Sequence, residues 1–299
     1  MNKEEIKEKF KKIFKYVNMD KHMNKKSVKK ILIIVLVVFL VITALWFWGE
    51  KVPNFFQQED ELAGLPCYKG EGIATIEIRG EIVPYFIEIP ESAKPESTED
   101  FDAVSSEEVV ACIGEIKNDK NMEGVIVEID SGGGSPFASE EIMNALKGLG
   151  KPTVAVVRER ATSGAYLIAS AADRIFASEV SDIGGIGVTM SYLDYSQQHE
   201  QDGIIYQQLS AGKFKNTGDP DRPLTAEEKE LFMRDINLMH EAFIKNVATN
   251  RNLDIEKVRK LADGSSMLGE MAKENGLIDE IGDANSAQSW LNDEIDAIQ

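Results

Sequence analysis

The serine at position 163 stands in a run of small residues, RATSGAY at residues 160–166. A β-branched segment at residues 153–157 precedes this run and an apolar stretch at residues 166–172 follows it, a pattern typical of a strand that turns into a helix. Small neighbours let a substrate backbone approach, and the amide of Gly164 would lie at the positive end of the helix dipole. Ser163 is therefore a candidate nucleophile, although serine is also a usual helix cap.

A glycine-rich segment, DSGGGS at residues 130–135, follows another apolar segment at residues 124–129. Successive glycines let backbone N–H groups converge on an anion. The amides of Gly133 and Gly164 could together hold the oxyanion that forms when Ser163 attacks a carbonyl, which would make an acyl-transfer site. A phosphate site and a simple tight turn are the other interpretations, but the Lys-Ser/Thr of a P-loop is missing.

A serine nucleophile needs a general base, and two lysines are candidates for it. His22 lies in the basic N-terminal segment, and the polar surroundings of His199 and His240 indicate surface residues. Lys213 and Lys215 follow a β-branched segment. A lysine accepts a proton at neutral pH only if burial lowers its pKa from about 10.4 towards 7, which costs roughly 4–5 kcal/mol. The base would therefore need a dry pocket, whereas an ordinary lysine lies in solvent.

The order of these motifs resembles the signal peptide peptidase A (SppA) family of Ser/Lys peptidases in the ClpP/crotonase superfamily. The shared pattern runs from about residue 72 to residue 282 and comprises, in chain order, Asp-Ser-x-Gly-Gly, Ala-x-Ser-Gly-x-Tyr, Ile-Gly-Val, Gly-x-x-Lys and Pro-x-Arg-x-Leu-Thr-x-Glu-Glu. The resemblance implies that Ser163 is the nucleophile and that Gly133 and Gly164 supply the oxyanion amides. It also implies Lys215 as the general base.

Lys215 is preferred to Lys213 because it stands third after Gly212, as the lysine of the family does after its glycine. The sequence departs from the family at two positions. Gly132 replaces a usual proline, which predicts a looser oxyanion loop, and Gly185 replaces a usual serine whose hydroxyl would help to orient the lysine.

The resemblance further implies a membrane-anchored serine endopeptidase that needs no cofactor or metal. Its substrates would be cleaved signal peptides and similar extended apolar peptides, and its chains would assemble into a ring-like homo-oligomer. A catalytically inactive scaffold or peptide-binding protein on the same fold is the alternative. Acyl-CoA chemistry fits poorly, since no basic patch for the CoA phosphates is evident.

Strand and helix patterns alternate through residues 71–299, which we interpret as the peptidase domain. Alternation of short buried strands with helices predicts an α/β fold with a mainly parallel sheet and flanking helices, ClpP/crotonase-like by the resemblance. Two shorter helices and a final amphipathic one follow the longest helix. The expected strands lie at residues 72–83, 124–129, 153–157, 174–177, 186–190 and 204–209. The expected helices up to and including the longest one lie at residues 105–118, 139–149, 166–172 and 225–250.

Residues 31–48 carry no charge and would span roughly 27 Å as a helix, which predicts one N-terminal transmembrane helix. The run is longer than a secretory signal requires and ends in LWFWG, a poor cleavage site. Residues 1–30 hold eleven lysines and four acidic residues, so the positive-inside rule keeps this tail in the cytoplasm and places the peptidase domain outside. Residues 49–70 are expected to form a linker.

The full chain of 299 residues has a formal net charge of −18 and a pI of about 4.7. Such an acidic balance argues against nucleic-acid binding. The resemblance implies peptides and further copies of the chain as partners, and the predicted membrane helix implies the lipid bilayer. Cys67 and Cys112 could pair in an oxidising compartment, but the apolar helical setting of Cys112 favours a simply buried thiol.

Overall fold

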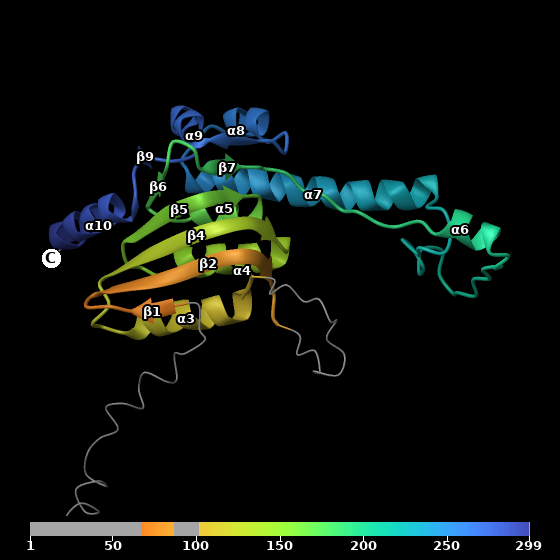
Figure 1. Cartoon of the computed structure of the whole chain (residues 1–299), viewed down its shortest axis with the longest axis horizontal. Helices are drawn as coiled ribbons and strands as arrows, with labels where there is room; N and C mark the ends of the chain where they lie inside the picture. The colour runs from red at the N-terminus through yellow and green to blue at the C-terminus, as the bar shows by residue number, and fades with distance from the viewer. Residues whose placement is uncertain (1–66, 87–101, 299) are drawn as a thin grey trace, which may run out of the picture. The chain divides into compact units, whose positions relative to one another are not determined.

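The computed structural model describes residues 67–86 and 102–298 (Figure 1). The predicted cytoplasmic tail (1–30), the predicted membrane helix (31–48) and residues 49–66 of the predicted linker lie outside the described residues. Among the residues that are described, no helix has both the length and the apolar character needed to cross a bilayer.

Within the described residues, nine strands form one sheet with the central order β1-β2-β4-β5-β6-β9. β3 pairs with β2, and β7 joins the end of β5 to β8. The pairings β1–β2 and β7–β8 are antiparallel and the others are parallel, which confirms the α/β fold with a mainly parallel sheet. The strands are β1 (Cys67–Lys69), β2 (Ile73–Val83), β3 (Ala103–Ser105), β4 (Gly124–Gly134), β5 (Thr153–Thr162), β6 (Arg174–Ala177), β7 (Asp182–Gly184), β8 (Ser266–Leu268) and β9 (Glu280–Ile281).

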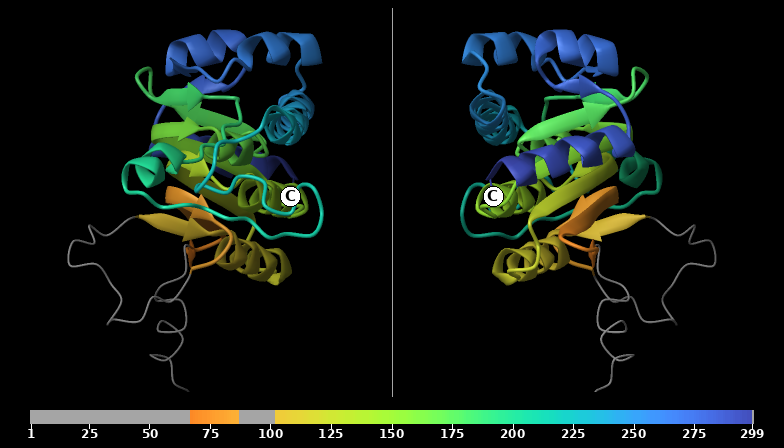
Figure 2. Two further views of the ribbon diagram at one scale, coloured as in Figure 1. Left: turned by 90° about the vertical axis from the view of Figure 1, so that its right-hand side faces the viewer. Right: turned by 90° about the vertical axis from the view of Figure 1, so that its left-hand side faces the viewer.

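Helices cover both faces of this sheet. Side chains that alternate along β4 and β5 point to opposite faces, so Val127 and Ile129 belong to the main core with α3, α4 and α5, while Ile126 and Val156 pack with α10. Figure 2 shows α10 lying across the strands. The helices are α3 (Ser106–Asn118), α4 (Pro136–Lys147), α5 (Gly164–Ala169), α6 (Ser196–Gln201), α7 (Ala226–Asn250), α8 (Ile255–Leu261), α9 (Gly269–Asn275) and α10 (Ala284–Ile298).

Local capping signals fix two of the helix starts. A capping box opens α7, where the Thr225 hydroxyl accepts from Glu228 N–H and the Glu228 carboxylate accepts from Thr225 N–H. Helix α4 begins earlier than predicted, because Ser135 caps it by accepting from Ala138 N–H. Ser139, at which the predicted helix begins, is instead a buried residue of the first turn.

The predicted strands at residues 186–190 and 204–209 are wrong, since both segments are irregular. They belong to the arm, which we define as residues 186–225, between β7 and α7. The arm runs out alongside α7 to α6 (Figure 1). Ile205 is 82% exposed and Leu209 is 98% exposed. β-Branched residues alone do not make a strand where no neighbouring strand accepts their backbone hydrogen bonds.

The interpretation of Cys112 as a simply buried thiol is also wrong, because Cys112 in α3 forms a disulfide with Cys67. Cys67 belongs to β1, so the end of the predicted linker is a strand at the edge of the sheet. The two Cα atoms lie 6.5 Å apart, within the range that a disulfide can bridge. The two cysteines are 45 residues apart in the sequence, so their spacing did not indicate that they lie close together in the structure.

Candidate active site

Ser163 occupies the sharp turn between β5 and α5. Its backbone has φ 55° and ψ −128°, a left-handed conformation that costs a non-glycine residue about 1–3 kcal/mol. A hydrogen bond from Ser163 N–H to the Gly184 carbonyl oxygen, 2.8 Å long, holds this turn against β7. The Ser163 hydroxyl makes no capping bond to α5, so the helix-cap interpretation of this residue is wrong. A strained serine between a strand and a helix is the arrangement of a nucleophile elbow.

The glycine-rich segment lies directly against this turn. Gly133 is buried with φ +97°, and a Cβ atom there would approach Gly164 N to 2.7 Å and Ser163 Cβ to 2.9 Å. A Cβ atom at Gly164 would come closer still to the hydroxyl of Ser139. The structure therefore brings together three of the four predicted site residues, Gly133, Ser163 and Gly164, and only glycine fits at the two flanking positions.

The Gly133 amide, predicted as an oxyanion donor, has a partner in this structure. It donates to the Ser131 hydroxyl oxygen at 3.0 Å, and the Ser131 hydroxyl in turn donates to the Gly80 carbonyl oxygen at 2.6 Å. Ser131 is buried, so this relay anchors the carboxyl end of β4 to β2. Binding of an oxyanion by Gly133 N–H would have to replace Ser131 as its acceptor.

Ser163 lines a cavity of about 680 Å³ whose walls come from distant parts of the chain. The segment after β7 and the loop between α8 and β8 face the turn that holds Ser163. Of the lining carboxylates, Asp263 accepts from Ser265 N–H and from its hydroxyl, which lowers the pKa of Asp263. The lining residues are Gly132, Thr162, Ser163, Asp182, Gly185, Gly187, Val188, Thr189, His240, Ala262, Asp263, Gly264 and Ser266.

Lys215 does not line this cavity. It lies in an exposed turn of the arm, close to the start of α7, and its side chain is in solvent. Lys213, the other candidate base, forms an exposed ion pair with Glu227 at 2.7 Å. Neither candidate base therefore lines the cavity that holds Ser163.

The turn that carries Lys215 is tied to α7 through Arg222. The Arg222 guanidinium donates to both carboxylate oxygens of Glu228, at 2.5 and 2.9 Å, and to the Asn216 carbonyl oxygen at 2.8 Å. The bonds from Arg222, with that from Thr225 N–H, lower the pKa of Glu228 to about 2. Glu228 therefore fixes both the start of α7 and the turn next to Lys215.

His240 is a cavity residue that the sequence did not reveal. It lies on α7 and lines the cavity together with Ser163. Its Nε2 atom is buried and has no hydrogen-bond partner among the residues that the structure describes. Helical periodicity gives the side of α7 on which His240 lies, but it cannot show that this side passes over the turn at Ser163.

The chain is similar in sequence to several proteins named as proteases. The chain is 38% identical over 181 residues to the protease MJ0651 of Methanocaldococcus jannaschii, so named provisionally, covering 60% of this chain and 58% of that protein. It is 31% identical to the chloroplastic serine protease SPPA of Arabidopsis thaliana, over 62% of this chain and 28% of that protein. It is 28% identical to Protease 4 of Haemophilus influenzae, over 72% of this chain and 33% of that protein. The chain thus spans between about a quarter and three fifths of these relatives.

A point mutant of ClpP1 from Listeria monocytogenes is similar in structure, with a TM-score of 0.46 and 17% sequence identity over 71% of this chain and 93% of that one. The sequence profile of Peptidase family S49 matches residues 145–297. This match covers just over half of the chain and includes Ser163, Gly164 and Lys215. The chain belongs to peptidase family S49.

Proposed function

We propose that the chain is a serine endopeptidase in which Ser163 is the nucleophile. The observation that carries the proposal is the strained conformation of Ser163 at the edge of a cavity, with the backbone of Gly133 and Gly164 packed against it. A strained backbone conformation persists only where the surrounding structure stabilises it, and strained residues cluster at active sites. Membership of family S49 supports the same chemistry.

In the proposed reaction, neutral Lys215 takes the proton from the Ser163 hydroxyl, and Ser163 Oγ attacks the scissile carbonyl carbon. The amides of Gly133 and Gly164 hold the resulting oxyanion, with Gly133 N–H exchanging Ser131 for the substrate oxygen. Lys215 then gives its proton to the leaving amine as the peptide bond breaks. A water molecule, deprotonated by Lys215, hydrolyses the acyl-enzyme.

Lys215 would reach the cavity from a second copy of the chain. In one chain this residue lies on the exposed arm and not in the wall of the cavity. The arm also exposes large apolar side chains, which include Leu193, Ile205 and Leu209. Exposed apolar surface of this kind is typical of a protein interface. Burial between two chains would also remove water from the lysine, which its role as a base requires.

The proposed location is the outer side of the cell membrane, with residues 31–48 as a single anchor. The disulfide between Cys67 and Cys112 supports this location, because disulfides persist in oxidising compartments outside the cytoplasm. The substrates in this proposal are cleaved signal peptides and similar extended apolar segments. The assembly is a homo-oligomeric ring next to the lipid bilayer.

A catalytically inactive peptide-binding protein is the second candidate. The position of Lys215 outside the cavity favours this candidate if the chains do not associate. The two functions differ in the reactivity of Ser163, because only an activated serine reacts rapidly with a fluorophosphonate.

The test combines fluorophosphonate labelling with hydrolysis of a fluorogenic peptide by the full-length membrane protein. We expect the wild type to be labelled at Ser163 and to cleave the peptide, and we expect Ser163→Ala to lose both properties while remaining folded. Ser266→Ala is the matched control, since it removes another hydroxyl from the same cavity. Undiminished hydrolysis by Ser163→Ala would overturn the proposed mechanism, and an unreactive wild type would favour the inactive protein.

A further inference from the structure

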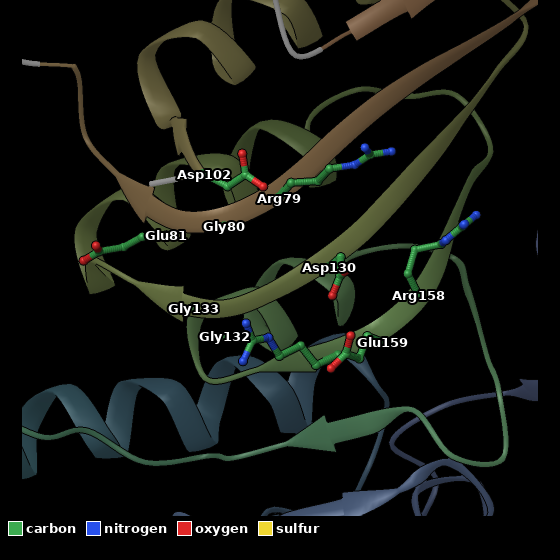
Figure 3. Close-up of a pocket in the computed structure, with 10 residues that line it drawn as sticks. Arg79, Gly80, Glu81, Asp102, Asp130, Gly132, Gly133, Arg158 and Glu159 are labelled. Carbon is green, nitrogen blue, oxygen red and sulfur yellow. The ribbon is translucent and has the colours of Figure 1, made fainter. Parts of the chain in front are cut away.

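A second cavity, of about 600 Å³, adjoins the site at the carboxyl ends of β2, β4 and β5 (Figure 3). We call it the charged groove. Gly132 lines both this groove and the cavity that holds Ser163. An extended peptide that leaves Ser163 over the glycine-rich segment would therefore enter the charged groove.

Two of the three arginines in the charged groove are already paired. Arg79 lies 3.2 Å from a Glu77 carboxylate oxygen and 3.8 Å from Glu128, and Arg158 lies 4.0 Å from the same Glu128 oxygen. Figure 3 shows the side chains of Arg79 and Arg158 pointing away from the glycine-rich segment. Both cations are therefore neutralised at a distance from the path of the peptide.

Arg160 is the third arginine, and it lies at the junction of the two cavities. It is exposed near the end of β5, three residues before Ser163. Its Cζ and Nη1 atoms lie 4.0 Å from the position that a Cβ atom would take at Gly132. Among the described side chains, none forms an ion pair with Arg160 within 4.0 Å. Its guanidinium is free to bind a planar anion through two parallel hydrogen bonds.

The remaining charges of the groove restrict where a negative group can bind. The other lining carboxylates are those of Glu81, Asp102, Asp130 and Glu159. They disfavour a carboxylate in the groove, and among the described residues Arg160 is the lining cation without an ion-pair partner to offset them. A substrate carboxylate is therefore accepted at one position along the peptide and disfavoured at its neighbours.

We propose that Arg160 is a specificity-determining residue that binds one carboxylate of the peptide substrate close to the scissile bond. The carboxylate belongs either to a glutamate or aspartate side chain or to the C-terminus of the peptide. The inference rests on the proposed function, because it takes the cleft at Ser163 as the place where the peptide is held.

The experiment measures kcat/KM for fluorogenic peptides that place a single glutamate, or glutamine as its neutral counterpart, at successive positions around the cleaved bond. A second set compares peptides with a free C-terminal carboxylate and with a C-terminal amide, which distinguishes the two sources. We expect one position at which the wild type prefers the carboxylate roughly tenfold or more, the usual strength of a charge-assisted hydrogen bond.

Arg160→Gln should abolish this preference, and Arg160→Glu should reverse it in favour of a lysine at that position. The matched control is Arg158→Gln, which removes a positive charge from the same groove and strand but from a paired arginine. We expect Arg158→Gln to keep the preference. Absence of a carboxylate preference in the wild type, or equal loss in both glutamine variants, would overturn the role of Arg160.

Binding of the same peptides to Ser163→Ala, followed by fluorescence anisotropy, separates this inference from the proposed function. A carboxylate preference in Kd that depends on Arg160 supports the inference even if no peptide is cleaved. If hydrolysis depends on Ser163 but its rate does not depend on the substrate carboxylate, the proposed peptidase function is supported and the role of Arg160 is overturned.

Discussion

Gly133 lies so close to Ser163 that a Cβ atom at position 133 would come within 2.9 Å of the serine Cβ. These residues are 30 positions apart in the sequence, with Gly133 at the carboxyl end of β4 and Ser163 directly after the neighbouring parallel strand β5. The carboxyl ends of parallel strands are where α/β folds hold their ligands. The site therefore depends on backbone contact between the carboxyl ends of two strands, which side-chain substitutions at either end should disturb.

Gly133→Ala should abolish both the reactivity of Ser163 and peptide hydrolysis. The new methyl group would meet Gly164 N and Ser163 Cβ, and alanine disfavours φ +97°. We expect the free energy of unfolding to fall by about 1–3 kcal/mol. Chemical denaturation and fluorophosphonate labelling measure the two effects. Gly132→Ala is the control, since its methyl group would lie no closer than 4.0 Å to Arg160, and equal damage by both variants would contradict the argument.

Ser163→Gly should be more stable than Ser163→Ala by about 1 kcal/mol, although both variants are inactive. Glycine adopts φ 55° without strain, whereas alanine keeps the strain of the serine. Urea denaturation of the two variants side by side gives the difference. Equal stability would mean that the turn does not store strain at position 163.

Glu228→Gln should lower the stability at neutral pH and weaken its dependence on pH. Because the pKa of Glu228 is lowered from its usual value of 4.5 to about 2 in the folded protein, its contribution is fully present above pH 4.5. It is then lost as the pH falls from 4.5 towards 2. Thermal unfolding of the wild type and the variant across this window should show a smaller acid-induced decrease in the variant.

The same substitution should also reduce hydrolysis, because Arg222 would hold the turn next to Lys215 less firmly. Glu227→Gln is the control, since Glu227 pairs with Lys213 and does not contact Arg222. A Glu227 variant with the same loss as the Glu228 variant would show that any carboxylate at the start of α7 has this effect.

Much of the fold follows from local patterns in the sequence. The alternating apolar residues of β2, the buried run of β4 and the capping box of α7 each specify their element within a few residues. The order strand, helix, strand then gives the parallel sheet. The arm was predicted wrongly because a strand also needs a neighbouring strand, and the two segments of the arm pair with none in the described part of the chain.

The site was predictable only where its residues stand next to turns. Ser163 and Gly133 each follow a buried strand, so the topology places them together. The position of His240 in the cavity wall and the pairing of Cys67 with Cys112 depend on contacts between distant segments. Neither motif spacing nor helical periodicity contains that information, and the same limit applies to the place of Lys215.

Removal of the disulfide should destabilise the protein without changing the chemistry of Ser163. The Cys67→Ala/Cys112→Ala double variant releases a loop closed by a sequence separation of 45 residues, for which chain entropy predicts a loss of about 4 kcal/mol. Thermal unfolding with and without dithiothreitol measures this loss. The chain has only two cysteines, so a reductant that lowers Tm in the double variant as well would contradict the assignment.

In the proposed mechanism, Ser163 of one chain works with Lys215 of another. The most direct measurement co-expresses Ser163→Ala chains with Lys215→Ala chains under two different affinity tags and isolates the mixed assemblies. Each variant alone should be inactive, and the mixture should regain about a quarter of the wild-type rate, the share of interfaces between neighbouring chains that carry both intact residues. An inactive mixture that does contain both chains, or full activity of Lys215→Ala alone, would contradict the claim.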